Sequence, residues 1–418
     1  MLSAMANVFR SAELRKKLLF TAAILAIYRF GTFVPVPGVN IDALQAAIEG
    51  RGNTNILSFL NLFAGGALTR FAVFALGIMP YITASIILQL MTVVIPSLEK
   101  LQKEGESGQQ KITQYTRYLT VALAILQSIA YVLYFKSQNA LPDFTWGRFY
   151  LIVISLVAGT VLVMWLGELV TQRGVGNGIS LLIFASIVAS VPEGLQAWWT
   201  MPPISRIIVG LLAAGVVVAV VFINEGQRRI PIQYAKRVVG RRMTTGGTTY
   251  MPLRVNMAGV IPVIFASSVV ILPPTLAELA GRGSVFQSVS DWLAPGSYYY
   301  IIFEALLIVL FTYFYTAVQF NPVDQADNLK KYGGFIPGVR PGRPTAVYLD
   351  RVLTRLTLPG AVYLAIIASL PTLIFRYLPD VNFYFGGTSL LIVVGVALDT
   401  MRQMEAQLMM RSYEGFLR

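Results

Sequence analysis

The sequence predicts an all-α polytopic membrane protein with about ten transmembrane helices. Of its 418 residues, 56% are hydrophobic and only 13% are charged. The mean hydropathy is +0.65, whereas a soluble chain of this length needs more charge to cover its surface. Apolar stretches of about 20 residues, long enough to cross a hydrocarbon core of about 30 Å, recur from one end of the chain to the other.

The expected spans are apolar runs bounded by charged residues, proline or glycine. The first run follows a basic segment, as in a signal peptide, but it continues through Arg29 to Pro35 without a small-residue cleavage site, so we expect a retained span. The predicted spans are Leu18–Val34, Phe71–Ile95, Tyr118–Phe135, Phe149–Gly167, Ile179–Trp198, Ile204–Ile223, Val255–Leu276, Tyr298–Val318, Leu356–Tyr377 and Phe383–Asp399.

Lysine and arginine gather in the segments on one side of these spans. Two long basic segments, residues 225–254 and 320–355, lie on the same side as the basic N-terminus. Because lysine-rich and arginine-rich loops stay in the cytoplasm, we expect both termini to be cytoplasmic.

The number of spans has a consequence for symmetry. Ten spans divide into two sets of five, and because five is odd, the second set enters the membrane from the opposite side. This count permits two inverted five-helix halves, residues 1–200 with spans 1–5 and residues 201–418 with spans 6–10. The Pro202-Pro203 pair is the expected hinge between them.

One segment of the first half is apolar but too short to cross a bilayer. Asn55–Leu68 ends in the glycine pair Gly65 and Gly66. A run of about 14 residues is typical of a re-entrant or half-membrane helix, and two adjacent glycines supply a flexible joint. The alternative is an amphipathic loop that lies on the outer membrane face.

The composition excludes several kinds of chemistry. The chain contains no cysteine and no histidine, so thiolate nucleophiles, disulfides, imidazole bases and the usual zinc ligands are missing. The nearest approach to a phosphate-binding loop, Gly105–Lys111, has the wrong spacing. We therefore expect neither an enzyme nor a cofactor, and any work must be driven by a partner or an ion gradient.

Seven segments carry distinctive motifs that together cover almost the whole chain. They are Tyr28–Val39, Ala75–Gln89, Arg173–Val188, Arg228–Met243, Val255–Ser268, Tyr332–Thr345 and Gly387–Asp399. In this order, on a ten-span scaffold, they resemble the SecY family of protein translocation channels. The resemblance implies two halves around a central pore in the bacterial cytoplasmic (inner) membrane. That pore would move unfolded secretory proteins across the membrane and release membrane-protein segments sideways into it.

A channel for unfolded polypeptide must pass any side chain while it holds back ions. A narrow ring of apolar side chains meets both demands, because stripping the water from an ion there costs many kcal/mol. Spans 2 and 5 each offer two isoleucines at i,i+4 spacing, on one helix face. The competing interpretation is that these isoleucines face lipid or a neighbouring helix. The resemblance places the pore ring at Ile78, Ile82, Ile183, Ile187, Ile264 and Ile392.

The resemblance also implies a plug and a lateral gate. The plug would be the segment 55–70, which moves aside during transport, and its central residues are Phe59, Leu60, Asn61, Leu62, Phe63, Ala64, Gly65 and Gly66. The gate would lie between spans 2 and 3 and spans 7 and 8, with polar residues at Thr83, Gln127, Ser267 and Ser268. We expect interhelical hydrogen bonds of about 0.6–2 kcal/mol there. Pro80 and Pro262 are expected to kink their helices.

The two basic segments predict a docking platform. Arg241, Arg242 and Arg340 are suited to pair with phosphate or carboxylate groups. The resemblance implies the ribosome and the SecA motor ATPase as alternative partners, SecE and SecG as accompanying subunits, and the translocating polypeptide and lipid bilayer as further contacts. The simpler interpretation is that these cations orient the chain and contact anionic lipid.

The main alternative function is an ion-coupled secondary transporter with inverted repeats. Such a protein needs carboxylates or broken helices near the membrane midplane, where this sequence offers isoleucines. The ionisable residues within or near the spans are Arg29, Glu168, Glu304 and Asp399. Arg29 lies near the outer end of its span, where it can extend its side chain towards water. A structural scaffold does not account for the short apolar segment, and an intramembrane enzyme lacks a buried carboxylate pair.

Overall fold

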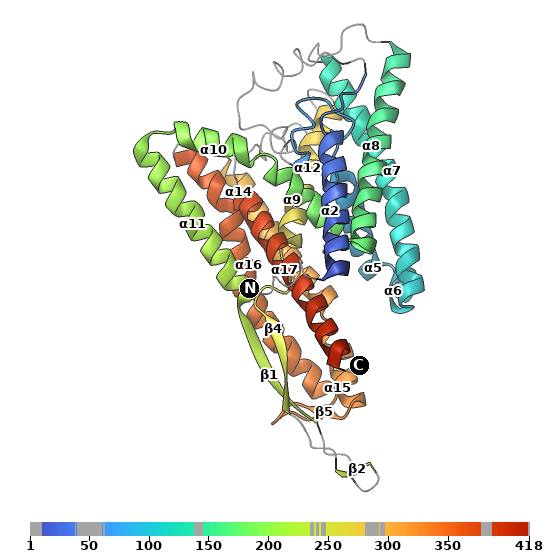
Figure 1. Cartoon of the computed structure of the whole chain (residues 1–418), viewed down its shortest axis with the longest axis vertical. Helices are drawn as coiled ribbons and strands as arrows, with labels where there is room; N and C mark the ends of the chain where they lie inside the picture. Colours follow the sequence, from blue (N-terminus) through green and yellow to red (C-terminus); the bar gives the residue numbers. More distant parts are fainter. Residues whose placement is uncertain are drawn as a thin grey trace.

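The computed structural model is built mainly from helices (Figure 1). It describes residues 11–37, 39, 61, 63–137, 145–234, 238–239, 242–243, 248–280, 292, 297–377 and 387–416. The plug residues Phe59, Leu60 and Leu62 and the docking residue Arg241 lie outside these ranges. The helices are α2 (Ala12–Gly31), α5 (Met79–Val94), α6 (Pro96–Lys103), α7 (Glu106–Ser137), α8 (Trp146–Arg173), α9 (Gly178–Val188), α10 (Val191–Thr200), α11 (Pro203–Glu225), α12 (Ile261–Ala280), α14 (Tyr298–Gln319), α15 (Pro322–Lys331), α16 (Arg343–Tyr377) and α17 (Gly387–Phe416).

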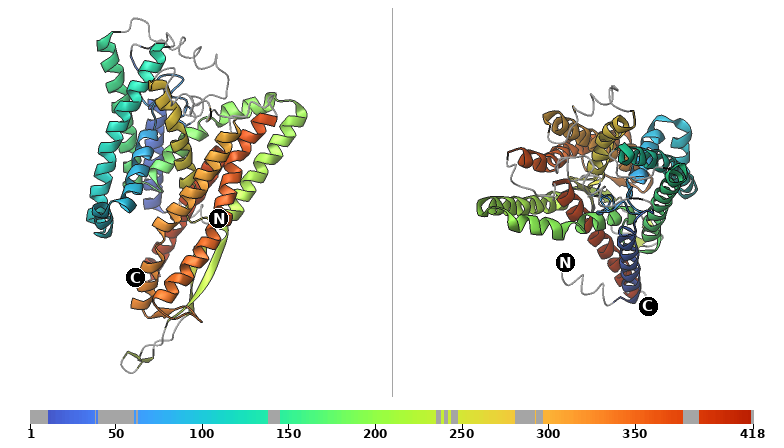
Figure 2. Two further views of the ribbon diagram at one scale, coloured as in Figure 1. Left: turned by 180° about the vertical axis from the view of Figure 1, so that it is seen from behind. Right: turned by 90° about the horizontal axis from the view of Figure 1, so that it is seen from above.

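The helices pack in two groups that meet at two places. In the first group, α8 contacts α2, α7 and α9, and α7 contacts α5. In the second group, α16 contacts α12, α14 and α17, and α17 also contacts α11. Helix α12 packs against α5 and α7, and α17 packs against α9, so these contacts join the two groups. The views from behind and from above show the same grouping (Figure 2).

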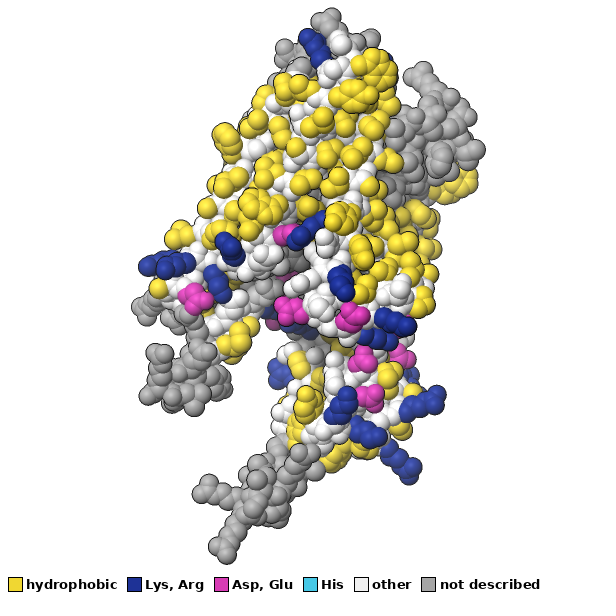
Figure 3. All heavy atoms as spheres, turned by 90° about the vertical axis from the view of Figure 1, so that its right-hand side faces the viewer, with side chains coloured by type: hydrophobic (Ala, Val, Ile, Leu, Met, Phe, Trp, Pro, Cys, Tyr) yellow, Lys and Arg dark blue, Asp and Glu magenta, His cyan; other side chains and the backbone are white. Residues whose placement is uncertain are grey.

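Several helices have the length and apolar character of membrane spans. In the described part of the chain, six helical stretches meet this description, or seven if the pair α5–α6, bent by 99°, is one span. Apolar side chains cover the upper part of the face in Figure 3, and charged side chains gather below it. The prediction of ten spans therefore stays a prediction.

The second predicted span begins later than expected. Residues 71–78 form turns, and α5 starts only at Met79. Pro80 lies in the first helical turn of α5, and Pro262 lies in the first turn of α12. The first N–H groups of a helix have no intrahelical acceptor, so proline begins these helices without breaking a hydrogen bond. The predicted kinks at both prolines were therefore wrong.

The chain is mainly helical, as expected, but the basic segments also contain strands, which the all-α prediction omitted. Three of them, β1 (Gln227–Tyr234), β4 (Thr248–Arg254) and β5 (Gly334–Phe335), form an antiparallel sheet in the order β4-β1-β5. Two short strands, β2 (Val238–Val239) and β3 (Arg242–Met243), pair with each other. Both basic segments therefore contribute to one sheet, which the sequence did not indicate.

The sheet has a small apolar core of its own. Along β1, Ile230 and Ile232 are buried while their neighbours are exposed, as expected of a strand with one covered face. The core cluster joins the hairpin to the first half of α16 and consists of Ile230, Leu253, Phe320, Ile336, Leu349, Val352 and Leu353. Helix α16 has 35 residues, about 53 Å at 1.5 Å per residue. Its first turns belong to the segment 320–355, which was expected to be a loop.

A polar network holds the foot of the β1–β4 hairpin. Asn256 Nδ2 donates to Asn224 Oδ1 at 3.0 Å and to the Gly259 carbonyl at 3.1 Å, just before α12 begins. Arg402 of α17 donates from Nη2 to the Asn224 carbonyl at 2.6 Å and to Glu225 Oε1 at 2.9 Å. We call these contacts the foot network. They connect the hairpin to both α12 and α17.

Candidate functional site

Six isoleucines from four helices lie in one apolar cluster. Their exposed fractions are 2% for Ile78, 4% for Ile82, 1% for Ile183, 0% for Ile187, 3% for Ile264 and 0% for Ile392. All six belong to the main hydrophobic core of the chain. Their side chains are thus turned inward and not toward lipid. We call these six residues the waist.

The α8–α9 turn fixes the position of the two isoleucines on α9. Asn177 caps α9, because its Oδ1 accepts from the backbone N–H groups of Ile179 at 3.0 Å and Ser180 at 3.4 Å. A β-carbon at Gly178 would lie 2.0 Å from the Gly167 carbonyl oxygen of α8. Only glycine permits this approach, so α9 lies directly against α8 and presents Ile183 and Ile187 one turn apart.

The other waist isoleucines come from the start of α5 and from the place where α12 and α17 pack together. Ile78 is the N-cap residue of α5, and its carbonyl accepts the Ile82 N–H at 3.1 Å. A β-carbon at Gly395 of α17 would lie 2.4 Å from Val260 Cγ1, at the start of α12. This close packing brings Ile392 and Ile264 into the same core.

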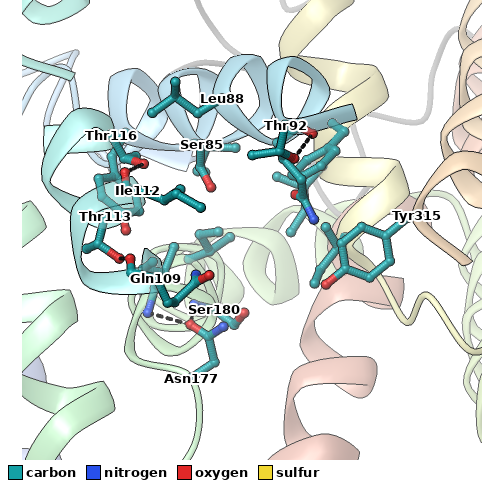
Figure 4. A pocket seen from close by; sticks show the side chains of 18 of the residues that line it. Ser85, Leu88, Thr92, Gln109, Ile112, Thr113, Thr116, Asn177, Ser180 and Tyr315 are labelled. Atoms are coloured by element: carbon teal, nitrogen blue, oxygen red, sulfur yellow. Dashed lines mark hydrogen bonds between the residues drawn. The ribbon is translucent and has the colours of Figure 1, made fainter. Parts of the chain in front are cut away.

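A cavity of ≈ 390 Å³ adjoins one side of the waist. Three waist residues, Ile82, Ile183 and Ile264, form part of its wall. The close-up shows labelled side chains from α5, α7 and α14, and from α9 with its capping residue, around this space (Figure 4). Uncharged polar residues line much of the remainder, and no charged residue is among the described lining residues. The polar members are Ser85, Gln89, Thr92, Gln102, Gln109, Thr113, Thr116, Asn177 and Ser180.

The described part of the predicted plug lies on the other side of the waist. Phe63 and Ala64 are buried, with exposed fractions of 1% and 2%. A β-carbon at Gly65 would lie 3.3 Å from Cα of Ser186, beside Ile187, and one at Gly77 would lie 3.4 Å from Cα of Ala64. Because α5 and α9 run in opposite directions through the waist, the cavity and this segment flank it from opposite sides.

The segment after the plug glycines has a defined turn structure. Asn61 Oδ1 accepts from the backbone N–H groups of Leu68 and Thr69, both at 3.1 Å, and the Asn61 carbonyl accepts the Gly66 N–H at 2.9 Å. Gly65 and Gly66 have φ of 65° and 82°, in the left-handed region that suits glycine. The two glycines therefore form a turn packed on α9, which we call the joint.

The residues of the predicted lateral gate lie on three helices that contact one another. Thr83 is on α5, Gln127 is half-buried on α7, and Ser267 and Ser268 are buried on α12. The expected interhelical hydrogen bonds from the hydroxyl groups were wrong. Thr83 donates to the Met79 carbonyl at 3.0 Å, and Ser268 donates to the Ile264 carbonyl at 2.7 Å. Ser267 likewise donates to carbonyls of α12 at 3.0 Å.

The predicted docking arginines lie beyond the apolar body. Arg242 lies in β3, and Arg340 is exposed in the turn between β5 and α16. Thr345 Oγ1 donates to the Arg340 carbonyl at 2.8 Å and holds the backbone of that turn. The strands β1 and β4 of the same sheet region carry further exposed arginines, at positions 228, 229 and 254.

The polar lining of the cavity was not predicted. Its signal was present on span 2, where Ser85, Gln89 and Thr92 recur at helical spacing among apolar residues. Gln109 and Asn177 gave no such signal, because they lie in segments interpreted as loops. Their place in the wall depends on how α7 and α9 pack around α5.

The fold defines a class, a multi-pass helical membrane protein, in which six buried isoleucines of one core adjoin a cavity with a largely polar lining. The SecY family model matches residues 72–401. The chain belongs to the SecY family.

Curated relatives and solved structures agree with this assignment. The chain is 52% identical over 440 residues to protein translocase subunit SecY of Streptomyces galbus, and 49% identical over 441 residues to that of Mycobacterium tuberculosis, with 100% of each chain covered. It matches the structure of a protein conducting channel with a TM-score of 0.66 at 17% identity, covering 93% of this chain and 91% of that one. The canine Sec61 channel from a ribosome-channel complex gives a TM-score of 0.61 at 17% identity, with the same coverage. The two structures support the fold, and the relatives identify a non-enzymatic channel subunit.

Proposed function

We propose that this chain is the pore-forming subunit of a protein translocase. It conducts unfolded secretory proteins across the membrane and releases membrane-protein segments sideways into the bilayer. The observation that carries the proposal is the waist, where six inward-facing isoleucines from four helices separate a polar cavity from a packed turn.

The waist suits a polypeptide better than it suits an ion. Isoleucine offers no hydrogen bond to replace an ion's water shell, so the energetic barrier to ions is high. A sliding polypeptide meets only non-directional contacts and finds no partner that would hold it. The vestibule binds and releases backbone groups through neutral amide and hydroxyl groups.

The joint and the segment before it act as a plug on the far side of the waist. Buried Ala64 lies against Gly77, next to Ile78, and Gly65 lies against Ser186, next to Ile187. Opening then requires this segment to leave α9, with Gly65 and Gly66 as the flexible point. The plug adds a second barrier to the one that the waist provides.

Sideways release uses the seam where α12 meets α5 and α7. These contacts are the direct joins between α12 and the first group of helices. Parting them opens the waist toward lipid, because Ile82 and Ile264 lie on the helices that separate. The two groups of helices, as the halves 1–200 and 201–418, move relative to each other in this step.

The basic surface formed by the β1–β4 hairpin and the turn between β5 and α16 is the cytoplasmic docking surface. Its cations orient both termini toward the cytoplasm of a bacterial cell by the positive-inside rule. The exposed Arg340 and the β1–β4 hairpin present donors to ribosomal RNA or to the SecA motor. SecE and SecG complete the membrane complex.

The cavity argues against an ion-coupled transporter. Such a carrier needs an ionisable or cation-binding group at its substrate site. The described residues that line this cavity are polar or apolar but uncharged. The transporter alternative is therefore not favoured.

Crosslinking to a stalled substrate tests the proposal. A photoreactive amino acid is placed at Ile82 or Ile187 in the full chain, which is reconstituted with SecE, SecG and SecA. We expect both positions to label a stalled secretory chain. Ile207 of α11, which is 62% exposed, serves as the control that faces lipid and stays unlabelled. Equal labelling from Ile207, or none from the waist, would contradict the proposed pathway.

A further inference from the structure

Arg29 lies near the end of α2 and contacts the joint. Its Nη1 donates to the Gly65 carbonyl oxygen at 2.5 Å and lies 3.4 Å from Thr32 Oγ1. A guanidinium that donates to a backbone carbonyl forms a charge-assisted hydrogen bond, which is stronger than a neutral one. The sequence suggested only that Arg29 extends toward water, so this contact is a role that the sequence did not reveal.

The side chain of Arg29 is held in place from two directions. Its Cζ lies 4.7 Å from the centre of the Phe33 ring, a cation–π contact. Thr32 Oγ1 donates to the Arg29 carbonyl at 2.6 Å and closes the last turn of α2. The side chain and the backbone of Arg29 are therefore both fixed where the guanidinium donates to Gly65.

Helix α2 is itself fixed against α9 at this level. The hydroxyls of Tyr28 and Ser186 are 2.6 Å apart and buried, and the Tyr28 ring stacks on Phe74 with 5.8 Å between ring centres. Gly65 packs against Cα of the same Ser186. Arg29, the joint and α9 thus meet at one point, beside the waist residue Ile187.

We propose that Arg29 is a positioning residue that holds the joint against α9 in the resting channel, through its hydrogen bond to the Gly65 carbonyl. The inference rests on the proposed function of the plug and names the contact that must break before the plug leaves. Apolar packing alone also keeps Phe63 in place, but it is less directional. The arginine adds a bond that is lost as soon as the glycine backbone rotates.

The size of the effect follows from the kind of bond. Removing a hydrogen bond to a charged group changes an equilibrium by about 10- to 100-fold. The equilibrium ratio of channels in which the joint has left α9 to channels in which it is packed on α9 should rise by that factor when residue 29 can no longer donate a hydrogen bond to Gly65. Arg29→Met keeps the apolar stem and removes the donors, so it tests the bond more than the packing.

Arg70 provides a matched control. Its Cζ lies 4.2 Å from the centre of the same Phe33 ring, so it carries an equal charge over the same aromatic group. Its Nη1 is buried without a hydrogen-bond partner in the described structure. Arg70→Met therefore removes a cation from this place without removing a bond to the joint.

Cysteine accessibility measures the joint directly, because the natural chain contains no cysteine. A single Ala64→Cys substitution places a thiol at a position that is 2% exposed. The full chain is reconstituted with SecE and SecG in vesicles, and the rate of modification by a membrane-impermeant maleimide is measured without substrate. We expect Arg29→Met to raise the rate by about 10- to 100-fold and Arg70→Met to change it by less than about 2-fold.

Ion flux from the same vesicles separates this inference from the proposed function. Faster modification together with faster flux supports both. Faster modification with unchanged flux supports the role of Arg29 and counts against the plug as a seal. An unchanged modification rate in Arg29→Met would overturn the role of Arg29. If that variant does not fold, Arg29→Leu removes the donors with a different apolar side chain, and a rate equal to that of the natural chain would overturn the role of Arg29 as well.

Discussion

The waist and the foot network both draw on α17 and on the region where α12 begins, and they are built from opposite kinds of contact. The waist consists of isoleucines that contribute no hydrogen bond through their side chains. The foot network consists of Asn224, Asn256 and Arg402, which are joined by hydrogen bonds of 2.6–3.0 Å. In the proposed channel, the side chains past which a polypeptide moves are apolar, whereas the side chains that keep the attached hairpin in place are polar.

The difference has a physical cause. Apolar contacts depend on area and not on direction, so they re-form in a new arrangement at little cost. A buried hydrogen bond has one geometry, and breaking it leaves a polar group without a partner. Substitutions that replace an apolar contact with a polar group, or a hydrogen bond with an apolar group, should therefore have large effects on ion flux or on stability. Substitutions that keep the kind of contact should have small effects.

The largest effect is expected when the waist is made polar. Asparagine at both positions in Ile183→Asn/Ile187→Asn supplies amides that hydrate the constriction. The barrier to ions should then fall by about 3 kcal/mol or more, which raises resting ion flux at least ~100-fold. Flux from vesicles that contain the resting channel measures this. Flux equal to that of the natural chain would show that the waist is not the seal.

A smaller effect is expected at the foot network. Arg402→Met removes the donors to the Asn224 carbonyl and to Glu225, at a cost of about 2 kcal/mol. Hydrogen exchange in β1 and β4 should accelerate by ~30-fold. Arg228→Met, which changes an exposed residue of β1, serves as the control. If both variants exchange alike, the network does not hold the hairpin.

An exchange of one apolar side chain for another in the waist should matter little. Ile183→Leu keeps the volume and the apolar character, so we expect less than about 1.5 kcal/mol of destabilisation. Export of a secretory protein should stay within about 3-fold of the natural rate. A loss as large as that of the asparagine variant would mean that the waist requires a specific shape and not only apolar surface.

The smallest effect on the fold is expected at Arg340. Because this residue is exposed in a turn, Arg340→Glu should change the stability of the chain by less than about 0.5 kcal/mol. Motor-driven export should nevertheless fall sharply, since the substitution reverses the charge at the proposed docking site for SecA. Thermal unfolding and an export assay with SecA measure the two quantities. Unchanged export would remove Arg340 from the docking surface.

The sequence was most informative where a pattern is local. The i,i+4 spacing put two isoleucines on one face of span 2 and two on one face of span 5, the resemblance turned those faces inward, and the structure places all four in one core. The glycine pair Gly65 and Gly66 marked a joint that the structure shows as a turn, whereas Pro80 and Pro262, which were expected to kink helices, lie in their first turns. Pro80 was expected to kink a helix because the preceding turns looked like part of the same apolar run.

Features that depend on distant residues could not be predicted in this way. The strand β1 pairs with β4 and with β5, and about 100 residues separate β1 from β5 along the chain, so no local pattern reveals the whole sheet. The bond between Arg29 and Gly65 depends on how α2 packs against α9. The hydroxyls of Thr83 and Ser267 were polar enough to suggest bonds between helices, but a carbonyl of the same helix was closer.

Those hydroxyls have a consequence for the energetics of insertion. Each one has already given its single proton to the backbone of its own helix, so separating α12 from α5 strands no hydroxyl donor of these residues in the hydrocarbon. Lipid tails that enter the proposed seam between α12 and α5 would meet hydroxyl groups that already donate to backbone carbonyls. In the proposed sideways release, the free energy of separating the two helices then depends on how well the apolar side chains of an incoming segment replace the contacts between them. The segments released into the bilayer would therefore be selected by their hydrophobicity.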